Sequence, residues 1–184
     1  QQLSLVYLDL PDIDITSKDS IISVFEQIQP DYIINCAAYT AVDKAETETE
    51  LAFKVNELGP ELLSKQASEL GAKLIHVSTD FVFDGKSHKP YVESDPMNPI
   101  SVYGKTKAEG ELKVIENSPE SIVLRTSWLY SKFGNNFVKT MVRLGEERER
   151  LNVVYDQIGT PTWARHLAHR ILTIIESNPA NLGG

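Results

Sequence analysis

Tyr103 and Lys107, four residues apart, are the side chains of this sequence best suited to proton transfer. Side chains with this spacing lie on one face of a helix, so a phenol and an ammonium can meet the same ligand. A free phenol has a pKa of about 10, and a neighbouring cation favours its ionised form. The pair therefore predicts a general acid–base site, with a solvated pair of helical side chains as the alternative.

A second polar group, formed by Ser78, Thr79 and Asp80, follows a predicted strand at residues 73–78. In an open parallel sheet, ligands bind outside the carboxyl ends of the strands. A hydroxyl group there, beside a tyrosine, could polarise a carbonyl and stabilise the oxyanion that forms as hydride arrives. The alternative is that these residues begin a turn, which is their commoner use at strand ends.

The elements that must position these groups alternate along the chain. Apolar runs predict strands at residues 3–8, 33–38, 73–78, 121–127 and 152–154, and helical periodicity or capping signals predict helices at 17–29, 43–70 (broken), 102–117, 133–149 and 163–176. This order indicates an α/β fold with a doubly wound, Rossmann-like parallel sheet covered by helices on both faces. No linker or repeat is visible, so residues 1–184 are expected to form one domain.

Asp9 ends the first predicted strand, where a carboxylate could bind the hydroxyls of an adenosine ribose or simply begin a turn before Pro11. The glycine-rich turn that binds a dinucleotide pyrophosphate is not found anywhere in the sequence. We therefore expect residues 3–8 to be the second strand of the fold, with the first strand–turn–helix unit lacking.

Composition excludes several classes of protein. With 41% hydrophobic and 24% charged residues, the chain is typical of a globular domain, and its net charge of −8 argues against nucleic acid or an anionic membrane as partner. The lone cysteine, Cys36, excludes an internal disulfide and favours the cytoplasm, and no apolar run is long enough to span a bilayer. The four histidines lack metal-ligand spacing, so no metal is expected.

Several longer motifs, in this order, resemble those of dTDP-4-dehydrorhamnose reductases, which are extended short-chain dehydrogenase/reductases. The motifs are NCAAYTAVDKAE (35–46), STDFVFDG (78–85), YGKTK (103–107), RTSWLY (125–130) and GNNF (134–137). The resemblance extends over nearly the whole chain. It also implies that the chain is truncated at both ends, without most of the C-terminal substrate lobe.

The resemblance implies reduction, by NADPH or NADH, of the C4 keto group of dTDP-4-dehydro-L-rhamnose to give dTDP-L-rhamnose. Tyr103 would donate the proton, Lys107 would lower the pKa of Tyr103 and hold the nicotinamide ribose, and Thr79 would bond the keto oxygen. The implied cofactor-binding residues are Asp9, Asp14, Ile15, Ala37, Ala38, Tyr39, Asn56, Ser78, Tyr103 and Lys107, and the substrate-binding residues are Thr79, Asp80, Trp128 and Asn136.

Two other functions fit the same motifs. An epimerase or dehydratase acting on another nucleotide sugar would keep the fold and change the product, and a regulatory relative would bind a partner with little catalysis. The presence of Thr79, Tyr103 and Lys107 favours an enzyme over a pure binding module. A homodimer is one possible assembly of such an enzyme.

Overall fold

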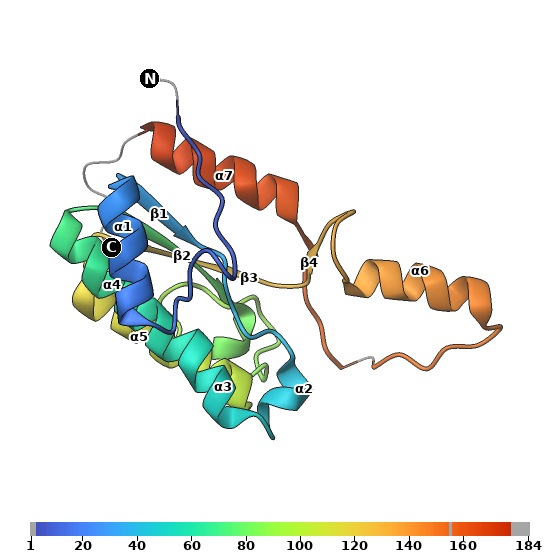
Figure 1. Ribbon diagram of the computed structural model, residues 1–184. Helices are drawn as coiled ribbons and strands as arrows, with labels where there is room; N and C mark the ends of the chain where they lie inside the picture. The colour runs from blue at the N-terminus through green and yellow to red at the C-terminus, as the bar shows by residue number, and fades with distance from the viewer. Residues whose placement is uncertain (1–2, 155, 178–184) are drawn as a thin grey trace.

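The computed structural model describes residues 3–154 and 156–177, and its centre is a three-stranded parallel sheet (Figure 1). The strands are β1 (Tyr32–Asn35), β2 (Lys73–Thr79) and β3 (Ile122–Thr126), in the order β1-β2-β3. The register pairs Ile34 with Ile75, and Thr79 with Thr126. β2 and β3 therefore end at the same edge of the sheet.

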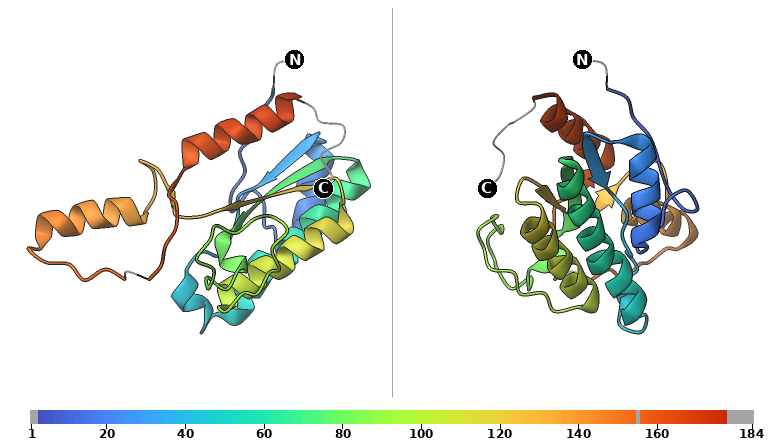
Figure 2. Two further views of the ribbon diagram at one scale, coloured as in Figure 1. Left: turned by 180° about the vertical axis from the view of Figure 1, so that it is seen from behind. Right: turned by 60° about the vertical axis from the view of Figure 1, so that its left-hand side comes forward.

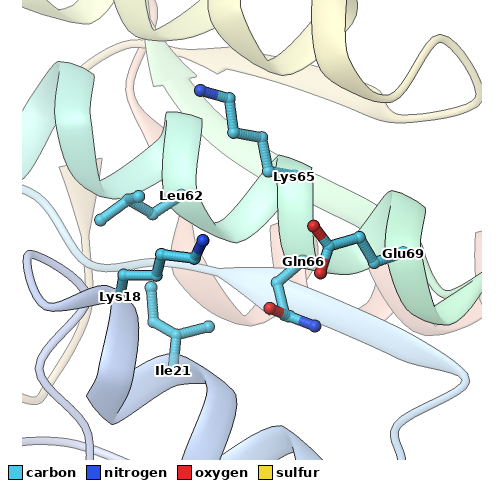
Figure 3. Close-up of a pocket in the computed structure, with 6 residues that line it drawn as sticks. All are labelled: Lys18, Ile21, Leu62, Lys65, Gln66 and Glu69. Atoms are coloured by element: carbon cyan, nitrogen blue, oxygen red, sulfur yellow. The ribbon is translucent and has the colours of Figure 1, made fainter.

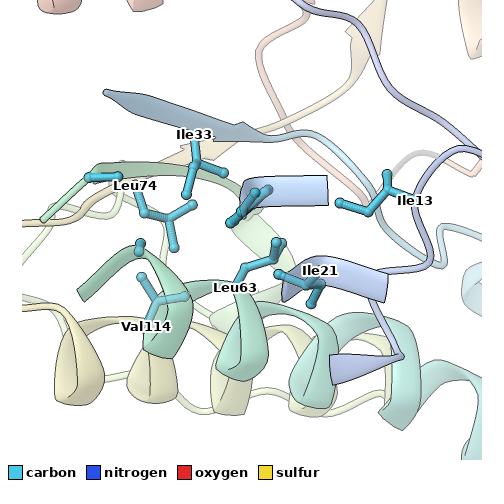
Figure 4. Packing of buried hydrophobic residues seen from close by; sticks show 9 residues of the cluster. Ile13, Ile21, Ile33, Leu63, Leu74 and Val114 are labelled. Atoms are coloured by element: carbon cyan, nitrogen blue, oxygen red, sulfur yellow. The ribbon is translucent and has the colours of Figure 1, made fainter. Parts of the chain in front are cut away.

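Three helices cover one face of this sheet: α1 (Lys18–Ile28), α4 (Gly59–Leu70) and α5 (Val102–Asn117). Their shared core, shown in Figure 4, includes Ile21 from α1, Leu63 from α4 and Val114 from α5, which pack with Ile33 and Leu74 of the strands. α1 is capped by Ser17, whose hydroxyl accepts a hydrogen bond from the Ser20 N–H.

The opposite face is covered by α7 (Ala164–Ser177) (Figure 2). Ile171 and Ile175 of this helix are buried with Ile75 of β2, and Ile122 and Leu124 of β3 pack against them. Because residues that alternate along a strand point to opposite faces, β2 supplies Leu74 to one core and Ile75 to the other. The predicted doubly wound, Rossmann-like sheet is confirmed.

The predicted broken helix consists of α2 (Val42–Ala45), α3 (Thr49–Phe53), the π-helical turn η1 (Lys54–Leu58) and α4. α4 ends at Gly71, whose φ of 68° is left-handed and suits glycine. A 3₁₀ turn, η2 (Asp80–Val82), directly follows β2. The connection from η2 to α5 is the loop that the glycines and prolines of residues 84–99 predict.

Two predicted strands are wrong. Residues 3–8 form no strand, and Leu5, Val6 and Tyr7 are 49%, 57% and 84% exposed. Residues 152–154 form none either, and Val153 and Val154 are exposed. A strand needs a hydrogen-bonding neighbour and apolar burial, and neither segment has a paired strand among the described residues.

The segment between β3 and α7 extends away from the sheet as an arm (Figures 1 and 2). It contains β4 (Leu129–Tyr130), which pairs in parallel with β5 (Thr162–Trp163), and between them the helix α6 (Phe137–Glu147). None of the residues of α6 is buried. Among the described residues, no helix has the length and apolar character needed to cross a membrane.

Candidate active site

The carboxyl edge of the sheet brings together the segments that follow its three strands. Cys36 and Ala37 follow β1, Thr79 ends β2, and Ser127 follows β3. The parallel register that places Thr79 beside Thr126 aligns the last two of these segments. The candidate site therefore lies at the edge of the sheet that the sequence predicts.

The start of α5 places Tyr103 against this edge. Ser101 caps the helix, its hydroxyl accepting a hydrogen bond from the Gly104 N–H at 3.0 Å. A Cβ on Gly104 would collide with the carbonyl oxygen of Phe81 in η2, so only glycine permits this approach. The phenyl ring of Phe81 meets the Tyr103 ring edge-on, with 5.5 Å between the ring centres.

Tyr103 is buried and lies within hydrogen-bonding reach of the Thr79 hydroxyl. Burial raises the pKa of Tyr103 above its ordinary value, and the charge of Asp80 adds to this, while the bond with Thr79 opposes it. Asp80 itself has a raised pKa because it is partly buried, although a bond from Thr79 opposes that shift. In this arrangement burial, rather than Lys107, dominates the pKa of Tyr103, and the phenol is held protonated at neutral pH.

Lys107, one turn further along α5, is 1% exposed. Its Nζ donates a hydrogen bond to the Val77 carbonyl at 2.8 Å and lies 3.5 Å from Nε2 of His76. Burial lowers the pKa of Lys107 to about 8, and the charge of Glu111 opposes this shift. The ammonium is therefore anchored to β2, beside the residues that end at the site.

Sequence reasoning missed two residues that contact this lysine directly or through one neighbour. His76 is fully buried in β2, and Nδ2 of Asn35 lies 3.0 Å from its Nδ1. Burial, with the charge of Lys107, lowers the pKa of His76 to about 3, so its ring is neutral. The signal was the presence of polar residues inside two otherwise apolar strands, which a packed core does not require.

Glu111 and Arg125 form an ion pair below the site. The guanidinium of Arg125 contacts both carboxylate oxygens of Glu111, at 2.7 to 3.1 Å, and Glu111 is 3% exposed. This pair ties α5 to β3 and occupies the carboxylate that lies one turn beyond Lys107 on the same helix face.

The predicted cofactor residues Ala37, Ala38 and Tyr39 follow β1, and the side chain of Asn56, another predicted cofactor residue, holds this segment in place. Asn56 is fully buried in η1, where its side-chain amide accepts a hydrogen bond from Tyr39 N–H and donates to the Tyr39 carbonyl and the Thr106 hydroxyl. Asn56 thus ties the segment that contains Ala38 and Tyr39 to α5. Ala37 and Ala38 have small side chains that let a ligand approach the backbone closely.

Among the predicted cofactor residues, Ser78 has a buried side-chain hydroxyl that lacks a hydrogen-bond partner in the described structure. It is 4% exposed, and its Oγ has no hydrogen-bond partner within the described residues. A bound ligand could supply the hydrogen-bond partner that this buried hydroxyl at the strand end lacks.

The remaining predicted cofactor residues lie before α1. Asp9 is exposed and, since residues 3–8 form no strand, does not end one, so that expectation is corrected; its Oδ1 accepts a bond from Leu10 N–H. The Asp14 carboxylate accepts bonds from the backbone N–H and the hydroxyl of Thr16. Ile15 packs on Gly59. Asp14 and Ile15 thus stabilise the entry to α1 in this structure.

The predicted substrate residues Trp128 and Asn136 lie in the arm. The Trp128 ring meets the ring of Phe137 edge-on, with 4.8 Å between the ring centres. Asn136 caps α6, accepting a bond from Lys139 N–H and donating to the Ser131 carbonyl. Asn136 is therefore the N-cap of α6 in this structure.

A pocket elsewhere on the molecule lies between α1 and α4 (Figure 3). Lys18 and Ile21 line it from α1, and Leu62, Lys65, Gln66 and Glu69 line it from α4. No predicted site residue lines this pocket. In the part of the chain that the structure describes, no three His, Cys, Asp or Glu side chains are grouped to hold a metal ion.

Comparison with known proteins adds to this geometry. The RmlD substrate binding domain family matches residues 1–182 of the chain. The chain belongs to this family. A curated relative, the dTDP-4-dehydrorhamnose reductase of Aggregatibacter actinomycetemcomitans, is 48% identical over 92% of this chain and 58% of its own length. The chain thus spans less than two thirds of that relative.

Two solved structures are also similar. The dTDP-4-dehydrorhamnose reductase of Clostridium acetobutylicum has 46% identity and a TM-score of 0.89, covering 92% of this chain and 60% of its own. The dTDP-4-dehydrorhamnose reductase of Bacillus anthracis, solved in complex with NADP, has 45% identity and a TM-score of 0.88 with the same coverage. These similarities agree with the fold described above.

Proposed function

We propose that this protein is an NADPH- or NADH-dependent reductase of dTDP-4-dehydro-L-rhamnose, with dTDP-L-rhamnose as product. The observation that carries the proposal is the meeting of Thr79 and Tyr103 at the carboxyl edge of the sheet, with Lys107 one turn away. The names of the similar proteins and the NADP in the Bacillus anthracis structure support the substrate and the cofactor.

The two hydroxyl groups act on the keto oxygen in this proposal. The Thr79 hydroxyl donates a hydrogen bond to that oxygen, and the Tyr103 phenol gives it a proton as it becomes an alkoxide. The raised pKa of Tyr103 suits a donor, because the phenol carries its proton throughout the neutral range. The nicotinamide cofactor, when bound, supplies the hydride that C4 receives.

The nicotinamide and ribose side of the cofactor would be held by Ser78, Lys107, Ala37 and Ala38. The sugar would be contacted by Trp128 and Asp80. Lys107 is already fixed by the Val77 carbonyl, so it needs little reordering to meet a ribose hydroxyl. The proposed contacts of the adenine side remain Asp9, Asp14 and Ile15. Tyr39 and Asn56 remain proposed cofactor residues, and the Asn56 side chain holds the backbone of Tyr39 in the segment after β1. Asn136 is a proposed contact of the sugar as well as the cap of α6.

We also propose a cytoplasmic homodimer. The unpaired Cys36 supports a reducing compartment. Leu112 and Ile115 on α5, which are 50% and 45% exposed, offer apolar surface to a second copy. Sedimentation of the full-length protein, with Leu112→Glu as the disrupting variant, tests the dimer.

The test of the proposed function is the loss of NADPH absorbance when the full-length protein meets dTDP-4-dehydro-L-rhamnose. The matched control is a dTDP sugar with a hydroxyl group at C4, which offers no ketone to reduce. Consumption with the keto sugar alone is the expected result, and consumption with neither sugar would reject the proposal.

A further inference from the structure

Asn35, His76 and Lys107 form a buried chain of polar contacts between two strands and α5. Asn35 is 4% exposed, His76 0% and Lys107 1%. Nδ2 of Asn35 lies 3.0 Å from Nδ1 of His76, and Nε2 of His76 lies 3.5 Å from Nζ of Lys107. Buried polar groups in such a chain must match donors with acceptors, so the chain limits where its protons can lie.

The orientation of the Asn35 amide is set by the backbone. The Ala37 N–H donates to Oδ1 of Asn35 at 3.0 Å, and a backbone N–H can only donate. The Asn35 NH₂ group therefore faces His76 and is the donor of their hydrogen bond. Nδ1 of His76 must then carry a lone pair and no proton.

The neutral imidazole has one ring proton, and with Nδ1 occupied as an acceptor that proton lies on Nε2. The Nε2–H points toward the amino group of Lys107. A lysine ammonium has donors only, so two donors would face each other, whereas the neutral amine offers a lone pair to the Nε2–H. Nζ keeps its bond to the Val77 carbonyl in either state.

The other groups around Lys107 act in the opposite direction. The Glu111 carboxylate on α5 favours the ammonium, and so does the Cys36 sulfur after β1 when it is ionised. Arg125 of β3 donates hydrogen bonds to both oxygens of Glu111 and so weakens its effect. Tyr103 lies one turn before Lys107 on the same helix.

We propose that Asn35 and His76 are positioning residues of this site: Asn35 fixes the Nε2–H tautomer of His76, which in turn restrains Lys107 and makes its ammonium easier to deprotonate. The low pKa of His76 and the lowered pKa of Lys107 agree with this arrangement. The consequence for catalysis rests on the function proposed above, because it concerns the charge beside Tyr103 during reduction. The tautomer itself does not depend on that function.

The first test is the ¹⁵N spectrum of the histidine side chains in the full-length protein without substrate. The chemical shifts and two-bond couplings to the ring protons distinguish a protonated Nε2 from a protonated Nδ1. We expect His76 to be neutral with Nε2 protonated at pH 7. A proton on Nδ1, or on both nitrogens, would overturn the inference.

The second test is Asn35→Asp. A carboxylate can accept from both the Ala37 N–H and a protonated Nδ1, so His76 should change to the Nδ1–H tautomer and Nε2 should accept from Lys107. The titration of the Lys107 side chain, followed by ¹³C at Cε, should then rise from about 8 by roughly one to three pH units. The alkaline limb of the pH–rate profile should move with it.

The matched control is Asn152→Asp, which adds the same charge at an exposed position. It should change neither the His76 tautomer nor the Lys107 titration. An unchanged tautomer in folded Asn35→Asp would overturn the inference, and if that variant does not fold, the wild-type spectrum still decides. A protein with the expected tautomer but no turnover would reject the proposed reductase alone.

Discussion

The half of the molecule built around the sheet and the arm that contains α6 differ in how their helices are held. α5 buries eight of its sixteen residues, including Tyr103 and Lys107, whereas α6 buries none of its eleven. Catalytic groups must be held within a fraction of an ångström, which packed helices achieve and exposed ones do not. The packed half is therefore the part suited to the proposed proton transfer, and the arm is suited to the proposed, more adjustable contacts with substrate.

Tyr103→Phe is the change with the largest expected effect. It removes the proposed proton donor and keeps the ring that packs on Phe81, so kcat should fall by about 10²- to 10⁴-fold. The measurement is NADPH consumption at saturating substrate, with the melting temperature as a check on folding. Turnover close to wild type in a folded variant would remove Tyr103 from the chemistry.

The two halves also contain ion pairs that can be compared. Glu111→Gln leaves the half-buried Arg125 without its carboxylate and should lower the free energy of unfolding by about 3 kcal/mol. Glu147→Gln breaks the exposed pair of Glu147 with Arg143 in α6 and should have no measurable effect. Chemical denaturation gives both values, and equal losses would show that the arm is as firmly held as the core.

Alanine substitutions at two glycines, one in α5 and one in α6, compare how closely the two helices are packed. A Cβ on Gly110 of α5 would collide with the carbonyl oxygen of Asn56, so Gly110→Ala should cost about 1–3 kcal/mol of stability. Gly145 of α6 has open space around it, and Gly145→Ala should stabilise α6 by about 0.5–1 kcal/mol through helix propensity. A tolerated alanine at 110 would contradict the close contact of α5 with η1.

Asn136→Ala has the smallest expected effect on the whole molecule. It removes the N-cap of α6 and should cost about 1 kcal/mol within that helix. Faster amide exchange in α6, with an unchanged global melting temperature, is the expected result because α6 is not packed against the sheet. A lowered global melting temperature would show that the arm and the sheet unfold together.

Sequence patterns predicted the packed half well for a physical reason. The apolar run of β2 records burial, and the structure shows burial for most of that strand. The placement of Thr79 in the candidate site followed from the rule that ligands bind outside the carboxyl ends of parallel strands. The helix expected at residues 17–29 was predicted from an equally local pattern and is confirmed as α1.

The errors lie where pairing, rather than pattern, decides the structure. Residues 3–8 and 152–154 have strand-like composition, but β-propensity describes fitness for a half-buried sheet and does not supply a neighbour. His76 and Asn35 were missed because their significance lies in a contact between two strands, which no local pattern encodes. The raised pKa of Tyr103 likewise depends on burial that only the assembled site creates.

The proposed reduction is tested most directly with NADPH deuterated at the transferable position of its nicotinamide, the full-length protein and dTDP-4-dehydro-L-rhamnose. NMR of the product locates the label. We predict one deuterium at C4 of the sugar for each NADPH oxidised. A changed sugar without deuterium at C4 and without net oxidation of NADPH would contradict a reductase and indicate an epimerase or dehydratase.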